Sequence, residues 1–131
     1  MNKSKNVISM VLKIIAFMLT ALLCIIIVLL LTQKPKDLKI TNIDASTIKD
    51  GVYVGSADNG LVKAAVSVEI SNGKIVNVSI LDHDNLLGKP AEKIVDSIVE
   101  QQSLDVDAIA SATYSSDTIR KAVENALRQG E

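Results

Sequence analysis

An uninterrupted apolar run near the N-terminus constrains this chain more than any other feature. Eighteen residues without a charge extend from Ile14 to Leu31. An α-helix rises 1.5 Å per residue, so this run covers about 27 Å, close to the roughly 30 Å hydrocarbon thickness of a bilayer. The sequence therefore predicts a transmembrane helix at residues 14–32, preceded by a short segment at residues 1–13.

Two other interpretations of this run fit the residues less well. A cleaved signal peptide has a shorter apolar core, usually about 7–15 residues, followed by small residues. The end of this run, at residues 29–33, offers no such cleavage site. A lipidated Cys24 would be expected to follow a small residue, but Leu22 and Leu23 precede it. We therefore expect Cys24 to be a thiol buried in the membrane.

Lysines flank the run on both sides and bear on its orientation. Three lysines precede Ile14, whereas Lys34 and Lys36 follow close behind the run. Cytoplasmic flanks carry the excess of positive charge, and the N-terminal amine adds to the first group. We expect a single-pass protein of the cell membrane, with a cytoplasmic segment at 1–13 and an extracytoplasmic C-terminal domain.

Composition excludes several classes of function. The 131 residues allow one compact domain plus an appendage. With 14 basic and 15 acidic side chains the net charge is −1, so the basic field that nucleic acids require is missing. One Cys and one His are too few for a disulfide framework or a soft-ligand metal centre. We expect no nucleic-acid partner and no metal site.

The part after the apolar run contains all the acidic residues and a regular pattern. Residues 33–48 show no clear period and include Pro35, which predicts a stalk or linker before a domain at 49–129. Gly51–Gly55 is a short strand candidate. Alternation of apolar and polar residues over 62–70 and 76–80, separated by Asn72-Gly73, predicts an antiparallel hairpin.

Two amphipathic helices are predicted to cover this sheet. Apolar residues recur at helical spacing from Ala91 to Val99, and Pro90 suits a first helical turn. The same spacing recurs from Ile119 to Leu127, where Ser115-Ser116-Asp117 offers capping groups. The predicted fold class is α+β: a small antiparallel sheet of about three strands, covered by two amphipathic helices and preceded by one transmembrane helix.

Five hydroxyl side chains crowd into the six residues 111–116, just before the predicted last helix. One interpretation is a turn with a well-capped helix, because Ser, Thr and Asp satisfy free N–H groups at such positions. The other is an anion site, because the open N–H groups and the positive end of the helix dipole favour a phosphate there. The residues alone leave both interpretations open.

The order of motifs over residues 50–128 resembles the FMN-binding domain family. The family's Asp-Gly-x-Tyr-x-Gly opening corresponds to residues 50–55, and its Gly-x-x-Ala approach to a helix corresponds to residues 88–91. Its Asp-x-[Val/Ile]-[Ser/Thr]-Gly-Ala-Thr-x-[Ser/Thr] signature is met by the following residues: Asp107, Ile109, Ala112, Thr113 and Ser115. Two positions depart from it, Ala110 in place of a hydroxyl residue and Ser111 in place of Gly.

The resemblance implies FMN as the cofactor, joined through its phosphate by a flavin transferase that uses FAD. It implies Ser115 as the acceptor, with Thr113 as the second choice. Asp107 would present the loop to the transferase or only form an Asx turn, and Tyr114 would stack on the flavin ring or be structural. The cofactor-binding residues implied are therefore Ser115, Thr113, Ala112, Ser111, Tyr114, Ser116 and Asp107.

Three functions follow as hypotheses. The first is a membrane-anchored flavoprotein that passes electrons at the outer face of the membrane, with the lipid bilayer, a flavin transferase and a membrane redox protein as partners. The second is an interaction or sensory module with noncovalent flavin or none, and the third is a purely structural anchored domain. The only His, His83, lies between Asp82 and Asp84, where we expect a solvated loop residue or a proton-handling group. No nucleophile–base pattern surrounds it, so we expect an electron carrier rather than a stand-alone enzyme.

Overall fold

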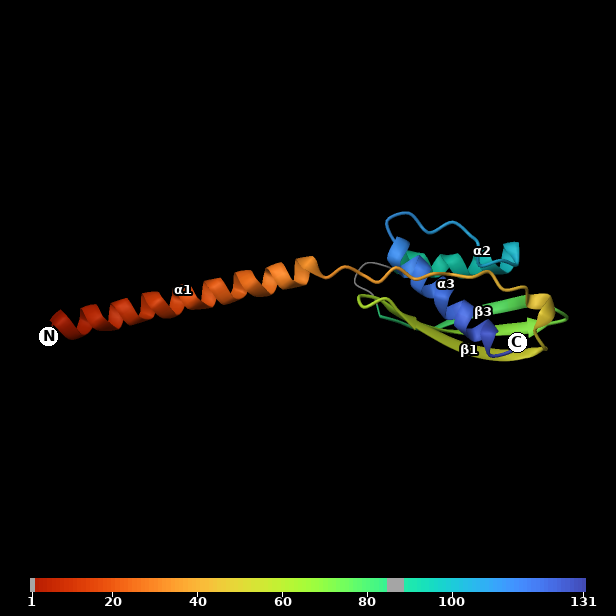
Figure 1. Ribbon diagram of the computed structural model, residues 1–131, viewed down its shortest axis with the longest axis horizontal. Helices are drawn as coiled ribbons and strands as arrows, with labels where there is room; N and C mark the ends of the chain where they lie inside the picture. The colour runs from red at the N-terminus through yellow and green to blue at the C-terminus, as the bar shows by residue number, and fades with distance from the viewer. Residues whose placement is uncertain (1, 85–88) are drawn as a thin grey trace. The chain divides into compact units, whose positions relative to one another are not determined.

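The computed structural model describes residues 2–84 and 89–131, and the chain forms two compact units, Met1–Lys34 and Pro35–Glu131. Gly88 of the helix approach motif lies outside the described residues. The elements, labelled in Figure 1, are in chain order α1 (Asn2–Thr32), the 3₁₀ turn η1 (Ala45–Thr47), β1 (Gly51–Asp58), β2 (Lys63–Ser71), β3 (Lys74–Asp84), the 3₁₀ turn η2 (Lys89–Lys93), α2 (Ile94–Gln101) and α3 (Thr113–Arg128).

The first unit consists of one continuous helix, α1. It is long and apolar enough to cross a membrane. The helix begins at Asn2, so it includes the segment before Ile14 as well as the predicted membrane span. Its 31 residues span roughly 46 Å at the rise of an α-helix, more than the hydrocarbon core of a bilayer.

The second unit contains an antiparallel sheet in the order β1-β2-β3, with β2 in the centre. The predicted hairpin between β2 and β3 is confirmed. Asn72 and Gly73 have φ angles of 51° and 71°, the left-handed pair that a two-residue hairpin turn of type I′ requires. Tyr53, Val68 and Val78 lie side by side across the three strands.

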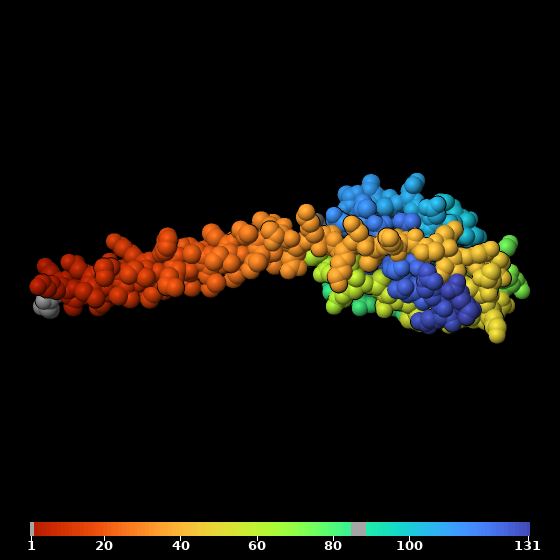
Figure 2. All heavy atoms as spheres, in the orientation of Figure 1, coloured from red at the N-terminus to blue at the C-terminus, as the bar shows by residue number. Residues whose placement is uncertain are grey.

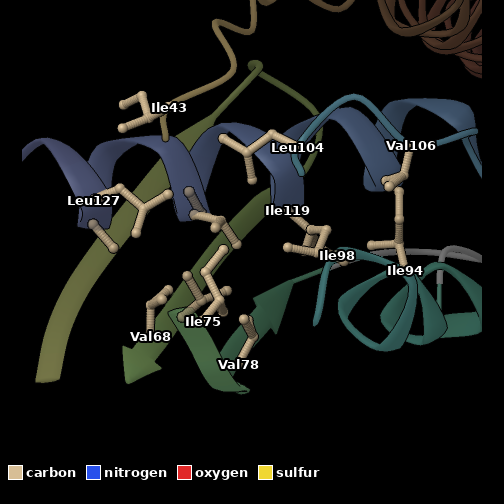
Figure 3. Packing of buried hydrophobic residues seen from close by; sticks show 14 of the residues in the cluster. Ile43, Val68, Ile75, Val78, Ile94, Ile98, Leu104, Val106, Ile119 and Leu127 are labelled. Carbon is tan, nitrogen blue, oxygen red and sulfur yellow. The ribbon is translucent and has the colours of Figure 1, made fainter. Parts of the chain in front are cut away.

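Helices α2 and α3 cover one face of this sheet, as the ribbon in Figure 1 shows. Helix α3 packs on β2, and Val66 and Val68 of β2 are fully buried in the same core cluster as Ile119 and Val123 of α3. Figure 3 shows Ile119 of α3, Ile98 of α2 and Ile75 of β3 among the buried residues of this core. The predicted α+β fold, three antiparallel strands covered by helices and preceded by a long apolar helix, is confirmed for the described residues.

The helix predicted from Ala91 has a different start. Lys89–Lys93 forms the 3₁₀ turn η2, which includes Pro90, and the α-helix proper begins at Ile94. It ends at Gln101, and the next residue, Gln102, adopts the left-handed conformation with φ of 52°. The Gln102 side chain then binds both backbone groups of Ile75 on β3, by bonds of 2.8 and 2.7 Å. The end of α2 is thus joined to a sheet edge.

Residues 35–44, which we term the strap, lie against α3 in the compact unit instead of forming a free stalk. The Lys36 N–H donates to the Asn59 carbonyl across 2.7 Å, and the Thr41 N–H donates to the Glu124 carboxylate across 2.9 Å. Ile43 is buried in the core. Figure 2 shows this segment in orange and yellow beside the blue C-terminal helix. The region predicted as a linker therefore supplies part of the domain.

Candidate functional site

The hydroxyl-rich stretch follows a loop whose start is fixed on both sides. The Leu104 N–H donates to Asn42 Oδ1 across 2.9 Å, and Arg120 Nε donates to the Leu104 carbonyl across 2.7 Å. Leu104 and Val106 are buried, and Val106 points toward Ile94 in Figure 3. The loop is thus bound to the strap, to α3 and to the core before it reaches residue 107.

A tight turn at residues 109–112 leads the chain into α3. The Ala112 N–H donates to the Ile109 carbonyl across 3.0 Å, and Ser111 has a φ of 60°. The hydroxyl of Ser116 accepts from the Ile109 N–H across 3.0 Å and donates to the Ala112 carbonyl across 2.8 Å. Ser116 is fully buried, and its two hydrogen bonds hold the turn against the first turn of the helix.

Helix α3 begins at Thr113 without a side-chain cap. The N-cap residue is Ala112, and no side chain accepts a hydrogen bond at that end. The sequence-based prediction that Ser115, Ser116 and Asp117 form the cap is wrong, because the helix starts two residues earlier and these residues lie within it. An uncapped helix start presents N–H donors and the positive end of the dipole.

The two candidate acceptor hydroxyls differ in exposure. Thr113, the first residue of α3, is exposed, whereas Ser115 is only 4% exposed. Tyr114 between them is 55% exposed. Ser111 and Asp107 are also exposed in the loop, and Ala112 is buried beneath it. The structure thus brings Ser111, Thr113 and Tyr114 to the surface and turns Ser115 and Ser116 inward.

His83 lies elsewhere. The Asp82-His83-Asp84 run belongs to β3 rather than to a loop, and the His83 side chain is 2% exposed. Its Nδ1 lies 3.2 Å from Glu92 Oε1 on η2. The expectation of a solvated loop histidine is therefore wrong. In the described part of the chain there is no group of three His, Cys, Asp or Glu side chains placed to hold a metal ion.

Sequence reasoning missed the polar groups that support the site. Glu124 is completely buried, and it accepts hydrogen bonds from Lys121 and Arg128 on its own helix as well as from Thr41. Arg120 joins the loop start to Asp117 across 3.1 Å. The spacing of Lys121, Glu124 and Arg128 gives a weak signal for helical ion pairs, but nothing in the local pattern indicates the bond to the strap.

The fold and this uncapped, hydroxyl-bearing helix start define a small α+β domain suited to a phosphorylated ligand. A family model described as the FMN-binding domain matches residues 59–128, more than half of the chain. The chain belongs to the FMN-binding domain family, and FMN is its cofactor.

Two relatives place the match in context. An uncharacterized protein of Treponema pallidum (strain Nichols) is 35% identical over 101 residues, 75% of this chain and 28% of that protein. The chain thus spans less than a third of the length of that relative. The crystal structure of the CPE2226 protein from Clostridium perfringens has a TM-score of 0.52 and 26% identity, covering 63% of this chain and 88% of that chain.

The residues at the start of α3 fit the phosphate end of FMN. Ala112 leaves the helix start without a side-chain cap, so its donors are not committed to another side chain. Thr113 places an exposed hydroxyl at the same point. The dipole of a 16-residue helix favours a negative group at this end.

Proposed function

We propose that this chain is a membrane-anchored electron carrier whose FMN is joined by a phosphodiester to the hydroxyl of Thr113. The observation that carries the proposal is an exposed hydroxyl on the first residue of an uncapped helix. Ser115 is the first choice from the family signature, but its side chain is turned inward. A transferase must reach the hydroxyl it modifies, so exposure favours Thr113.

The attachment balances as a simple group transfer from FAD. The hydroxyl oxygen attacks the phosphorus on the flavin side of the pyrophosphate. The bond between this phosphorus and the bridging oxygen of the pyrophosphate breaks. AMP leaves, and the hydroxyl proton passes to solvent. The N–H groups at the start of α3 stabilise the negative charge that the phosphodiester keeps.

The domain's own residues hold the acceptor loop in place and orient the flavin. Ser116 holds the turn that precedes Thr113, and Arg120 and Asn42 fix the start of the loop. Tyr114 presents an exposed aromatic face beside the acceptor, which suits stacking with a planar ring. When bound, FMN supplies the electron-transfer chemistry that these side chains lack.

Flavin retention after denaturation tests the attachment and its position. The full chain is coexpressed with a flavin transferase, denatured, separated by electrophoresis and viewed for flavin fluorescence. We expect a fluorescent band for the wild-type chain. The band should be absent in Thr113→Ala and present in Thr113→Ser and Ser115→Ala. Thr47→Ala, at an exposed threonine on η1, is the matched control.

The opposite pattern, with the band lost in Ser115→Ala and kept in Thr113→Ala, would identify Ser115 as the acceptor and overturn our choice. A yellow native protein that loses its colour in denaturant would show noncovalent FMN. A colourless protein would favour the interaction or sensory module.

We also propose that α1 anchors the chain with its N-terminus in the cytoplasm and residues 35–131 outside. The three lysines before Ile14 support this orientation. A Glu131→Cys variant, in a Cys24→Ala background, should react with a membrane-impermeant maleimide in intact cells. Gly130 is unsuitable for this label, because a Cβ there would lie 2.5 Å from Ile48 Cγ2. Labelling only after cell lysis would place residue 131 in the cytoplasm and contradict the proposed orientation.

A further inference from the structure

The β1–β2 turn, residues 58–63, is hydrogen-bonded to the beginning of the strap. The Lys36 N–H donates to the Asn59 carbonyl of this turn across 2.7 Å, and Lys36 follows Thr32, the last residue of α1, by four residues. We propose that the turn docks on the lipid bilayer, with the Leu61 side chain inserted among the headgroups. This inference rests on the proposed anchoring by α1 and is independent of the flavin.

The short connection keeps the turn near any membrane that α1 spans. The apolar run ends at Leu31, so the hydrocarbon core of the bilayer ends close to this residue. Four residues of extended chain cover at most about 14 Å, and the headgroup region adds about 5–7 Å outside the hydrocarbon core. Lys36 and the turn bonded to it are therefore held within reach of the headgroups.

The strap leads the chain from this turn to the opposite end of the sheet. Beyond the strap, Ser46 of η1 has its Cα 3.2 Å from the position of a Cβ added at Gly73 in the β2–β3 hairpin. The two turns lie at opposite ends of β2, whose nine residues cover about 30 Å at the rise of a β-strand. Figure 1 shows this course of the strap along the domain. The β1–β2 turn is thus the end of the sheet that is bonded closest to the anchor along the chain.

The two ends of the sheet expose different side chains. Leu61 in the β1–β2 turn is 49% exposed, whereas the hairpin turn consists of Asn72 and Gly73 and is followed by Lys74. A single exposed leucine is ordinary on a protein surface. At the end of the domain nearest the anchor, however, it has the chemistry and the location of an apolar side chain that enters a membrane interface.

Hydrogen bonds hold the turn in one conformation behind Leu61. The buried Asn59 side chain accepts from the Leu61 and Val62 N–H groups across 2.9 and 2.8 Å. The Asn59 N–H donates to the Val62 carbonyl across 3.1 Å, and the Asp58 carboxylate accepts from the Gly60 N–H across 2.7 Å. Because the turn is already ordered, it loses little conformational entropy when it meets a surface.

Apolar burial contributes more to this contact than charge. Lys63 is exposed, but it lies 3.7 Å from Asp58 and pairs across the strands with Asp84, so attraction to anionic lipid is largely offset. Removing the exposed half of one leucine side chain from water favours the docked state roughly fivefold. So small a gain would not bind a free domain, but the tether to α1 supplies a high effective concentration of lipid surface.

Spin-label accessibility tests the docking on the full chain, in a Cys24→Ala background, in phosphatidylcholine vesicles. A nitroxide on Lys63→Cys reports the β1–β2 turn, and one on Lys74→Cys reports the far hairpin; each substitution removes one exposed lysine. We expect the label at residue 63 to be relaxed mainly by oxygen dissolved in the lipid. The label at residue 74 should be relaxed mainly by a water-soluble nickel complex.

Substitutions at Leu61 then separate docking from proximity. Leu61→Ser should make the label at residue 63 more accessible to nickel, whereas Leu61→Phe should leave it in lipid. Val76→Ser is the matched control, because it removes another exposed apolar side chain of the sheet and should change neither label. High salt should also leave the accessibility at residue 63 unchanged.

Equal accessibility at residue 63 in the chain with Leu61 and in Leu61→Ser would show that the tether alone brings the turn near lipid, and would overturn the docking. Greater relaxation by nickel than by oxygen at residue 63, or lipid contact that high salt removes, would overturn it as well. Failure of the proposed anchoring has a different appearance, because the chain then does not float with the vesicles in a density gradient.

Discussion

The backbone N–H of Thr41 donates a hydrogen bond to the Glu124 carboxylate across 2.9 Å, joining positions 83 residues apart in the sequence. Lys121 and Arg128 bind the same buried carboxylate. Burial raises the pKa of Glu124, but the bonds from Thr41, Lys121 and Arg128 together lower it below its usual value. The ionised carboxylate is therefore part of what holds the strap on α3.

Glu124→Gln should destabilise the domain by about 2–3 kcal/mol at pH 7. This cost is below that of breaking a fully buried ion pair, because the side chains of Lys121 and Arg128 both reach water. A lowered folded-state pKa contributes stability above the unfolded value near 4.5, and this stability is lost as the pH falls through the folded pKa. Urea unfolding of the full chain in detergent, between pH 3 and 7, should show a shallower acid decline in the variant.

Glu69→Gln is the control, because Glu69 is exposed on β2. An acid decline in Glu124→Gln as steep as that of wild type would contradict this role for Glu124.

Gly55→Ala should cost more than about 3 kcal/mol. A Cβ at this position would lie 2.2 Å from the Ala122 carbonyl oxygen and 2.3 Å from the Ala126 nitrogen, so α3 must move away from β1. Gly60→Ala is the comparison, since nothing lies within 4 Å of its added Cβ and only its φ of 96° is unfavourable; we expect about 1–2 kcal/mol there. Thermal unfolding would measure both, and equal losses would count against tight α3–β1 packing.

Ser111→Gly should stabilise the turn before α3 by about 0.5–1 kcal/mol. Ser111 has a φ of 60°, a left-handed conformation that costs a residue with a Cβ roughly 1–2 kcal/mol, and the greater freedom of unfolded glycine offsets part of the relief. Ala110→Gly is the matched neighbour, and its φ is not positive. It should lower stability in the same unfolding assay. A loss of stability in Ser111→Gly would contradict the strained turn.

Gln102→Leu should cost about 2–3 kcal/mol, because the Ile75 N–H and carbonyl would both lose their side-chain partner. Hydrogen exchange at the Ile75 amide should accelerate in this variant. Gln101→Leu, at the exposed neighbouring position, should leave that amide as protected as in wild type. Unchanged exchange in Gln102→Leu would show that the sheet edge does not depend on this side chain.

The strands and helices could be predicted from the sequence because each leaves a pattern in its own residues, alternation for a strand and helical spacing for a helix. Alternation along β2 and β3 and the Asn72-Gly73 turn were sufficient for the hairpin. The strap was interpreted as a linker because residues 35–44 have no period. Their contacts, such as that of Thr41 with Glu124, are made with groups far along the chain. No local signal reports such pairing.

The sequence analysis placed the start of the last helix near Ser115, whereas the helix begins at Thr113. Capping preferences placed the N-cap near Ser115, whereas the turn held by Ser116 brings the chain into helical geometry at Thr113. That shift of two residues changes which hydroxyls face solvent. The backbone conformation of Ser111 was not predicted either. Its φ is positive, and a serine in the sequence gives no sign of that.

The position of FMN on the wild-type chain is the most direct test of this account. The protein is purified from the cells that make it, digested without reducing the flavin, and sequenced by tandem mass spectrometry. We predict that the peptide containing residues 113–116 bears the mass of FMN less water, localised to Thr113. An unmodified Thr113 would contradict it, whether the FMN mass lies on Ser115 or on no peptide.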